Sequence, residues 1–141
     1  MSQLQNFIWL SSQAFSAIVY LWYISVAILA FLVVAIIVTW PFGKIQHLGR
    51  LTWAFIPFAL PLAALLCGTI FVQTGPVTPY ILEWPVYIIY TLLILHIPVS
   101  IFLTIKSKDY RFITAALSLL SIWFLLMASF VSIMSITGDW L

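Results

Sequence analysis

Four long apolar stretches, separated by three short polar ones, dominate this sequence. Each apolar stretch has about 20 residues or more, enough for an α-helix to cross a hydrocarbon core about 30 Å thick. The short connections make successive helices antiparallel neighbours. The pattern therefore predicts an all-α integral membrane protein, with one four-helix transmembrane domain over residues 1–141. The predicted spans are residues 14–40, 51–72, 80–105 and 112–136.

The polar interruptions contain residues that end helices. Pro41 and Gly43 follow the first span, and residues 73–79 contain two prolines and a glycine. Proline removes a backbone donor and clashes with the preceding turn, and glycine is a common helix stop. Gly138 provides such a stop after the fourth span. We therefore expect breaks between the spans at these positions.

The amino-terminal segment, residues 2–16, is weakly amphipathic and admits two interpretations. It either extends the first helix or lies flat on the outer membrane interface. We favour the extension. The segment has no Lys or Arg, and the apolar run continues to Trp40, so we expect a permanent span and not a cleavable signal peptide.

Composition places the chain in lipid. Hydrophobic residues make up 65% of it and charged residues only 6%, whereas a soluble domain carries about 25% charged residues. The five basic residues lie in two short turns, too few and too local for a surface that follows phosphates, so we expect no nucleic-acid partner. Cys67 is the single cysteine, which excludes an internal disulfide.

The placement of charge predicts the orientation. All five Lys and Arg residues lie in the first and third turns, on one side of the membrane. Both termini, Glu83 and Asp139 lie on the other side. The positive-inside rule makes the basic turns cytoplasmic, with N-out/C-out topology. We expect a bacterial-type inner (cytoplasmic) membrane.

Small residues recur at steps of three and four along three spans. Such seams let helices approach closely in lipid, where little hydrophobic drive remains. They suit packing inside a four-helix bundle and contacts with other chains equally well. Pro57 and Pro61 should also bend the second span. The second seam consists of Ala54, Pro57, Pro61, Ala64 and Gly68. The fourth consists of Thr114, Ser118, Ser121, Ala128, Ser132 and Ser135. A weaker seam on the first span consists of Ser16, Tyr20, Tyr23, Ala27 and Ala30.

His96 is the sharpest candidate for chemistry. It lies roughly 15 Å from Lys106 and roughly 20 Å from Glu83 along a helix, and hence near the middle of the membrane. An ionisable residue there suggests a haem or metal ligand, a quinone-binding group or a proton relay. The alternative is a neutral imidazole bonded to a Ser, Thr or carbonyl on an adjacent helix. We favour this packing role.

Other candidates lie near the predicted interfaces. Glu83 opens the third span, where an acid complements the helix dipole, and Tyr87 and Tyr90 follow on the same half of that helix. These three residues are candidate partner contacts. The first basic turn offers candidate contacts to anionic lipid through Lys44, His47 and Arg50. A bis-histidine haem within the chain is not expected, because His47 and His96 lie at different depths.

The sequence has no nucleotide-binding glycine loop, no Cys/His metal cluster and no nucleophile with a visible base. We therefore expect no enzymatic activity from the chain alone. The favoured hypothesis is a small accessory subunit of a larger membrane complex, such as an electron-transfer assembly, with other integral-membrane subunits and structural lipids as partners. One alternative is a redox-enzyme anchor that uses His96 for a haem or quinone shared with a partner. Another is a small oligomeric carrier or channel.

Overall fold

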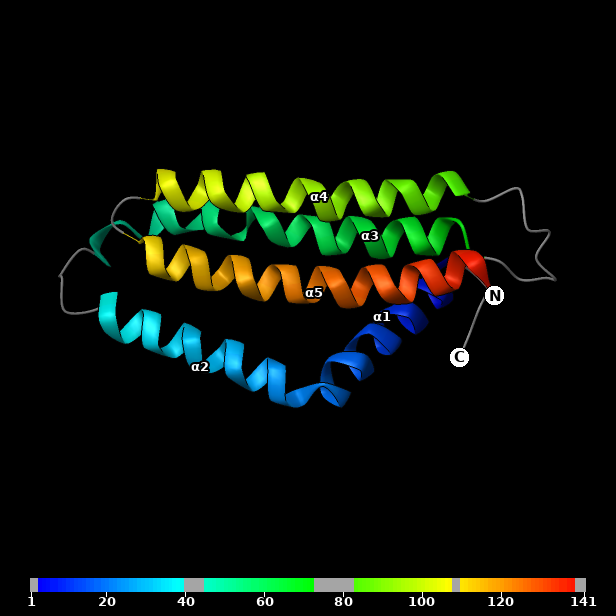
Figure 1. Cartoon of the computed structure of the whole chain (residues 1–141), viewed down its shortest axis with the longest axis horizontal. Coiled ribbons are helices and arrows are strands. Elements are labelled where there is room, and N and C mark those ends of the chain that lie inside the picture. Colours follow the sequence, from blue (N-terminus) through cyan, green and yellow to red (C-terminus); the bar gives the residue numbers. More distant parts are fainter. Residues whose placement is uncertain (1–2, 40–44, 73–82, 108–109, 139–141) are drawn as a thin grey trace.

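The computed structural model describes residues 3–39, 45–72, 83–107 and 110–138 (Figure 1). These residues are almost entirely helical and contain no strand. Four helical stretches are long and apolar enough to cross a membrane, which confirms the predicted class: Trp22–Thr39, Thr52–Ile70, Trp84–Lys106 and Arg111–Thr137. The helices are α1 (Gln3–Tyr20), α2 (Trp22–Thr39), the 3₁₀ helix η2 (Ile45–Phe58), α3 (Ala59–Ile70), α4 (Glu83–Lys106) and α5 (Arg111–Thr137).

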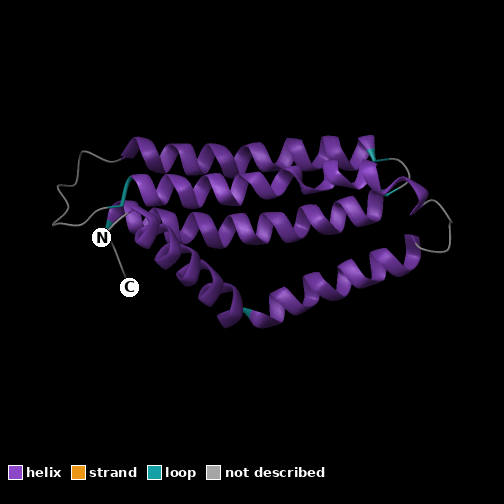
Figure 2. Ribbon diagram, turned by 180° about the vertical axis from the view of Figure 1, so that it is seen from behind, coloured by secondary structure: helices purple, strands orange, loops and turns teal. Residues whose placement is uncertain are grey.

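Helix α5 is the centre of the structure. It contacts each of the other helices. Half of its span is buried, against 17% for the span in α4 and 11% for that in α2. Figures 1 and 2 show α3, α4 and α5 lying side by side along the long axis. In both views α1 and α2 form a bent arm whose apex points away from these three helices.

The seams predicted on the second and fourth spans meet each other between α3 and α5. Ser132 Oγ donates to the carbonyl of Ala64 at 2.9 Å, and Ser135 Oγ donates to that of Gly68 at 3.3 Å. Leu125 packs against Ala64 in the same interface. Small residues on both helices therefore let serine side chains reach the neighbouring backbone, as the prediction required.

The first predicted span, residues 14–40, is not one straight helix. The helix is interrupted at Leu21, and helix α1 covers the residues before this interruption, from Gln3 to Tyr20. Across the interruption the Ile24 amide bonds to the Leu21 carbonyl at 3.0 Å, a tighter i→i−3 bond. No proline or glycine lies nearby. Instead, Ser25 Oγ donates to the Ile18 carbonyl at 3.3 Å, so a side chain enters the backbone ladder and bends the helix.

All five residues of the seam predicted on the first span are exposed, so this seam does not pack within the described part of the chain. Tyr20 and Tyr23 are 83% and 57% exposed. Helix α1 is buried instead through Leu10 and Ala14, which cluster with Val131 of α5. The less exposed positions instead form one stripe, at steps of three and four, that continues through the bend into α2: Leu10, Ala14, Ala17, Leu21, Ser25, Ile28, Leu32, Ala35 and Thr39.

The two prolines of the second span mark a change of helix type. The 3₁₀ helix η2 contains Pro57 and ends at Phe58. Helix α3 begins at the next residue, Ala59, and contains Pro61. Neither Pro57 nor Pro61 has an amide hydrogen, so α-helical bonds to the carbonyls four residues earlier cannot form. Both prolines are buried, so the backbone at these two positions packs against neighbouring helices, where irregular backbone is tolerated.

Candidate functional site

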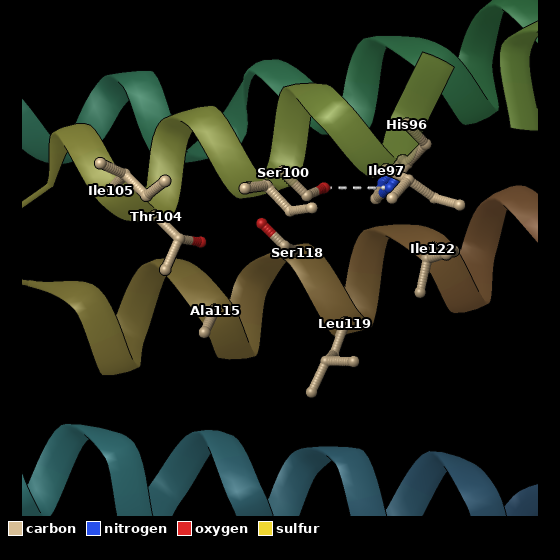
Figure 3. A pocket seen from close by; sticks show the side chains of 10 residues that line it. His96, Ile97, Ser100, Thr104, Ile105, Ala115, Ser118, Leu119 and Ile122 are labelled. Carbon is tan, nitrogen blue, oxygen red and sulfur yellow. Dashed lines mark hydrogen bonds between the residues drawn. The ribbon is translucent and has the colours of Figure 1, made fainter. Parts of the chain in front are cut away.

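The candidate site lies around His96, halfway along α4. The imidazole is 1% exposed and is enclosed between α4 and α5. Its Nδ1 lies 3.0 Å from Ser100 Oγ, one helical turn further along α4 (Figure 3). Its Nε2 lies 3.0 Å from Ser121 Oγ of α5. The Nε2 bond joins the two helices, and the Nδ1 bond holds the ring within α4.

This geometry restricts what His96 can do. A neutral imidazole has one N–H donor and one lone pair, so one serine accepts a hydrogen bond from the ring and the other donates one to it. A metal or haem iron would need the lone pair, and the bond to the donating serine would then break. Ser121 is also the kind of partner that the packing interpretation requires, a serine on an adjacent helix.

Helix α5 has three further buried hydroxyl groups. The side chains of Thr114, Ser118 and Ser129 on α5 are buried, and their hydroxyls have no hydrogen-bond partner among the described residues. Serine and threonine hydroxyls in membrane helices commonly turn to the carbonyl one turn back, which is available to each of these residues. Helix α5 therefore buries more hydroxyl groups than the His96 cluster uses.

A groove runs beside this polar interface, between α4 and α5 (Figure 3). Its volume is about 440 Å³. Apolar side chains form most of its wall, and Ser118 faces into the space between the helices. The lining residues are His96, Ile97, Ser100, Ile101, Thr104, Ile105, Ala115, Ser118, Leu119 and Ile122.

Tyr87 and Tyr90, two of the other predicted site residues, do not join His96. Tyr87 and Tyr90 are 61% and 48% exposed on α4. Glu83 is the first residue of α4, but its side chain lies outside the described part of the chain. The side chains of His47 and Arg50, and all of Lys44, also lie outside it.

Cys67 contributes to packing between α3 and α4. It is buried, and its Sγ lies 3.8 Å from the Pro85 carbonyl. Within the described residues, no three His, Cys, Asp or Glu side chains come together as a metal-binding group. The candidate site is therefore a histidine–serine cluster beside an apolar groove.

Sequence reasoning did not find the link between Trp123 and Ser25. Trp123 Nε1 donates to Ser25 Oγ at 3.1 Å, and Ser25 in turn donates to the Ile18 carbonyl. Trp123 is buried in α5, so the bend of the first helix is tied to the central helix. One signal was available, because a buried indole N–H usually finds an acceptor. The partner could not be identified without the fold.

No protein-family model matches this sequence, and comparisons with curated proteins and with solved structures found no match. Any function must therefore be argued from the residues themselves.

Proposed function

We propose that this protein is a small accessory subunit of a larger integral-membrane complex, such as a respiratory or other electron-transfer assembly. The observation that carries the proposal is a set of polar side chains exposed around the bend between α1 and α2. Gln13, Ser16, Tyr20 and Tyr23 are all exposed there. Lipid chains cannot satisfy these groups, whereas polar groups of a partner helix can.

The depth of the bend supports this argument. Ser25 bonds to Trp123, which lies near the middle of the 27-residue helix α5. Tyr20 and Tyr23 are within about one and a half helical turns of Ser25, so their backbone lies at a similar depth in the membrane. A phenol exposed to hydrocarbon without a partner is costly. A partner helix seated on the bend would remove that cost.

A groove at the same place offers room for a partner. It lies between α1 and α5, and its volume is about 610 Å³. Gln13, Ser16 and Tyr20 line one wall, and Met127, Phe130 and Met134 line the other. Methionine adapts to irregular partner surfaces, and aromatic side chains are enriched at interfaces. The groove therefore combines adaptable apolar contacts with exposed hydrogen-bonding groups.

In this proposal His96 has a packing role and not a cofactor role, because both ring nitrogens already have serine partners. The topology is four antiparallel spans with both termini outside and the basic turns cytoplasmic. The five Lys and Arg residues in two turns support this orientation. A bacterial-type cytoplasmic membrane is the proposed location.

Site-specific photo-crosslinking in native membranes tests the proposal. A benzophenone amino acid at Tyr20 or Tyr23 should give a crosslink to one defined integral-membrane protein. The matched control is Ile37, which is exposed on α2 but distant in sequence from the bend. The same probe at Ile37 should give mainly lipid adducts. A symmetric homo-oligomer, or equal lipid labelling at all three positions, would count against the accessory role.

A further inference from the structure

The α4–α5 groove faces the surroundings of the protein. Its rim on α4 consists of Ile97, Ile101 and Ile105, each more than half exposed. Leu119 and Ile122 of α5 form the opposite side (Figure 3). In a chain whose helices cross a membrane, such a rim lies against lipid tails. The groove has the shape and polarity to hold an alkyl chain.

One cation lies on the same strip of α5 as the groove. Arg111, Ala115, Ser118 and Ile122 follow at steps of four, three and four residues, so they share one face of the helix. The last three line the groove, and Arg111 continues the strip to the end of α5. Arg111 is exposed. A guanidinium group therefore sits on the line of the groove, where the helix meets the basic turn.

The start of α5 adds to this positive charge. The residue before the helix is Tyr110, whose side chain makes no capping hydrogen bond. The amide hydrogens of a first helical turn and the helix dipole both favour an anion there. The turn Lys106–Arg111 also has three basic residues and one acid. Local charge at this end of the groove is therefore positive from both side chains and backbone.

We propose that this groove binds one acyl chain of an anionic phospholipid, with the lipid phosphate held by Arg111. Arginine pairs with phosphate through two parallel hydrogen bonds. The distance along α5 from Arg111 to Ile122 is about 16 Å, which matches one leaflet of a hydrocarbon core about 30 Å thick. A chain that enters beside Arg111 thus ends near the level of His96. This site needs no protein partner and is independent of the proposed accessory role.

Lys106 provides a matched control at the same end of the protein. Its Nζ lies 4.7 Å from the centre of the Trp53 ring and 5.7 Å from that of Phe102. Trp53 belongs to η2, so Lys106 points toward that helix, whereas Arg111 shares the α5 strip that lines the groove. Lys106→Gln and Arg111→Gln remove the same charge near the same turn. Only Arg111→Gln should affect the proposed site.

Native mass spectrometry of the delipidated protein, titrated separately with phosphatidylglycerol and phosphatidylcholine of identical acyl chains, tests the headgroup. One basic residue near an anionic surface favours binding by about fivefold. We expect wild type and Lys106→Gln to retain phosphatidylglycerol with about that preference, and Arg111→Gln to lose most of it. Equal retention of the two lipids by wild type, or equal effects of the two substitutions, would overturn the proposal.

A phosphatidylglycerol with a diazirine in its acyl chain tests the location. Labels should map to residues 97–105 and 115–122. Ala115→Phe fills the groove and should abolish them, whereas Ala59→Phe, on exposed α3 surface, should not. Labels concentrated in the α1–α5 groove would refute the site. If Ala115→Phe does not fold, the labelling pattern of wild type and Arg111→Gln decides the question.

Discussion

Gly68 of α3 and Ser132 of α5 are so close that no side chain fits between them. A β-carbon placed on Gly68 would lie 2.6 Å from both Cβ and Oγ of Ser132, and 2.9 Å from its Cα. Real β-carbons do not approach other atoms so closely. The contact lies between the two serine–carbonyl hydrogen bonds that join these helices. It therefore sets the separation of α3 and α5.

Gly68→Ala should consequently destabilise the protein, even though alanine is the better helix former. Because the clash involves Cα and Cβ of Ser132, a rotamer change cannot relieve it, and the helices must move apart. Overpacking of this kind costs about 1–3 kcal/mol. The measurement is the unfolding midpoint in mixed micelles, followed by circular dichroism.

Ser132→Gly provides the control for this clash. It removes the two atoms that an alanine at residue 68 would approach most closely, Cβ and Oγ, and leaves Cα in place. It also loses the bond to the Ala64 carbonyl. The double variant should therefore be more stable than the sum of the two single effects predicts. Strict additivity would show that the close contact does not set the helix separation.

The second prediction concerns the His96 cluster. His96→Ala and Ser121→Ala each break the link between α4 and α5, so the double variant should cost less than the two single variants together. Hydrogen bonds between membrane helices are worth about 0.6 kcal/mol on average and up to about 1.7 kcal/mol. We expect a coupling energy in that range. Thr91 is a matched control, because its hydroxyl bonds to the Tyr87 carbonyl within α4, and Thr91→Ala should show no coupling to Ser121→Ala.

The third prediction tests His96 as a cofactor ligand. Purified from cells supplied with haem, the chain alone should show no Soret band, because both ring nitrogens are bonded to serines. Absorption spectroscopy makes the measurement. A Soret band that disappears in His96→Ala would contradict the packing role and revive the redox-anchor hypothesis.

The fourth prediction concerns the bend at Leu21. Ser25→Ala removes both the bond to the Ile18 carbonyl and the acceptor for Trp123. The angle between α1 and α2 should then vary more widely. Spin labels at Phe15 and Val33, both exposed, would report it as a broader distance distribution in pulsed EPR. Trp123→Phe should have a smaller effect of the same kind, and Trp22→Phe, at an exposed position, should have none.

The fifth prediction concerns orientation. In a Cys67→Ala background, a cysteine at Ser107 should react with a membrane-impermeant maleimide only when the cytoplasmic face is accessible. A cysteine at Leu141 should react from the opposite face. Labelling of both positions from one side would contradict the four-span topology, and exchanged sides would contradict the positive-inside assignment.

The sequence alone was sufficient for the class of protein and for most helix positions. Spans of apolar residues in a chain with 6% charge leave only a membrane fold, and in lipid every backbone group must be satisfied within helices. The third and fourth spans were predicted within a few residues of α4 and α5. The small residues that join α3 to α5 were also visible, because their spacing of three and four is a local property.

Only the tertiary structure decided which groups meet. No proline or glycine in the sequence indicates the bend at Leu21. The bend depends on the hydrogen bond from Ser25 to the Ile18 carbonyl and on the bond to Ser25 from Trp123, which is 98 residues away. His96 has no evident partner in the sequence, but the packing of α4 on α5 brings it into hydrogen-bond distance of Ser121, 25 residues away. The periodicity of residues along the sequence shows which residues share a face of one helix, but not which face of another helix they contact. Contacts between helices depend on rotation and depth relative to each other, and those are properties of the folded bundle.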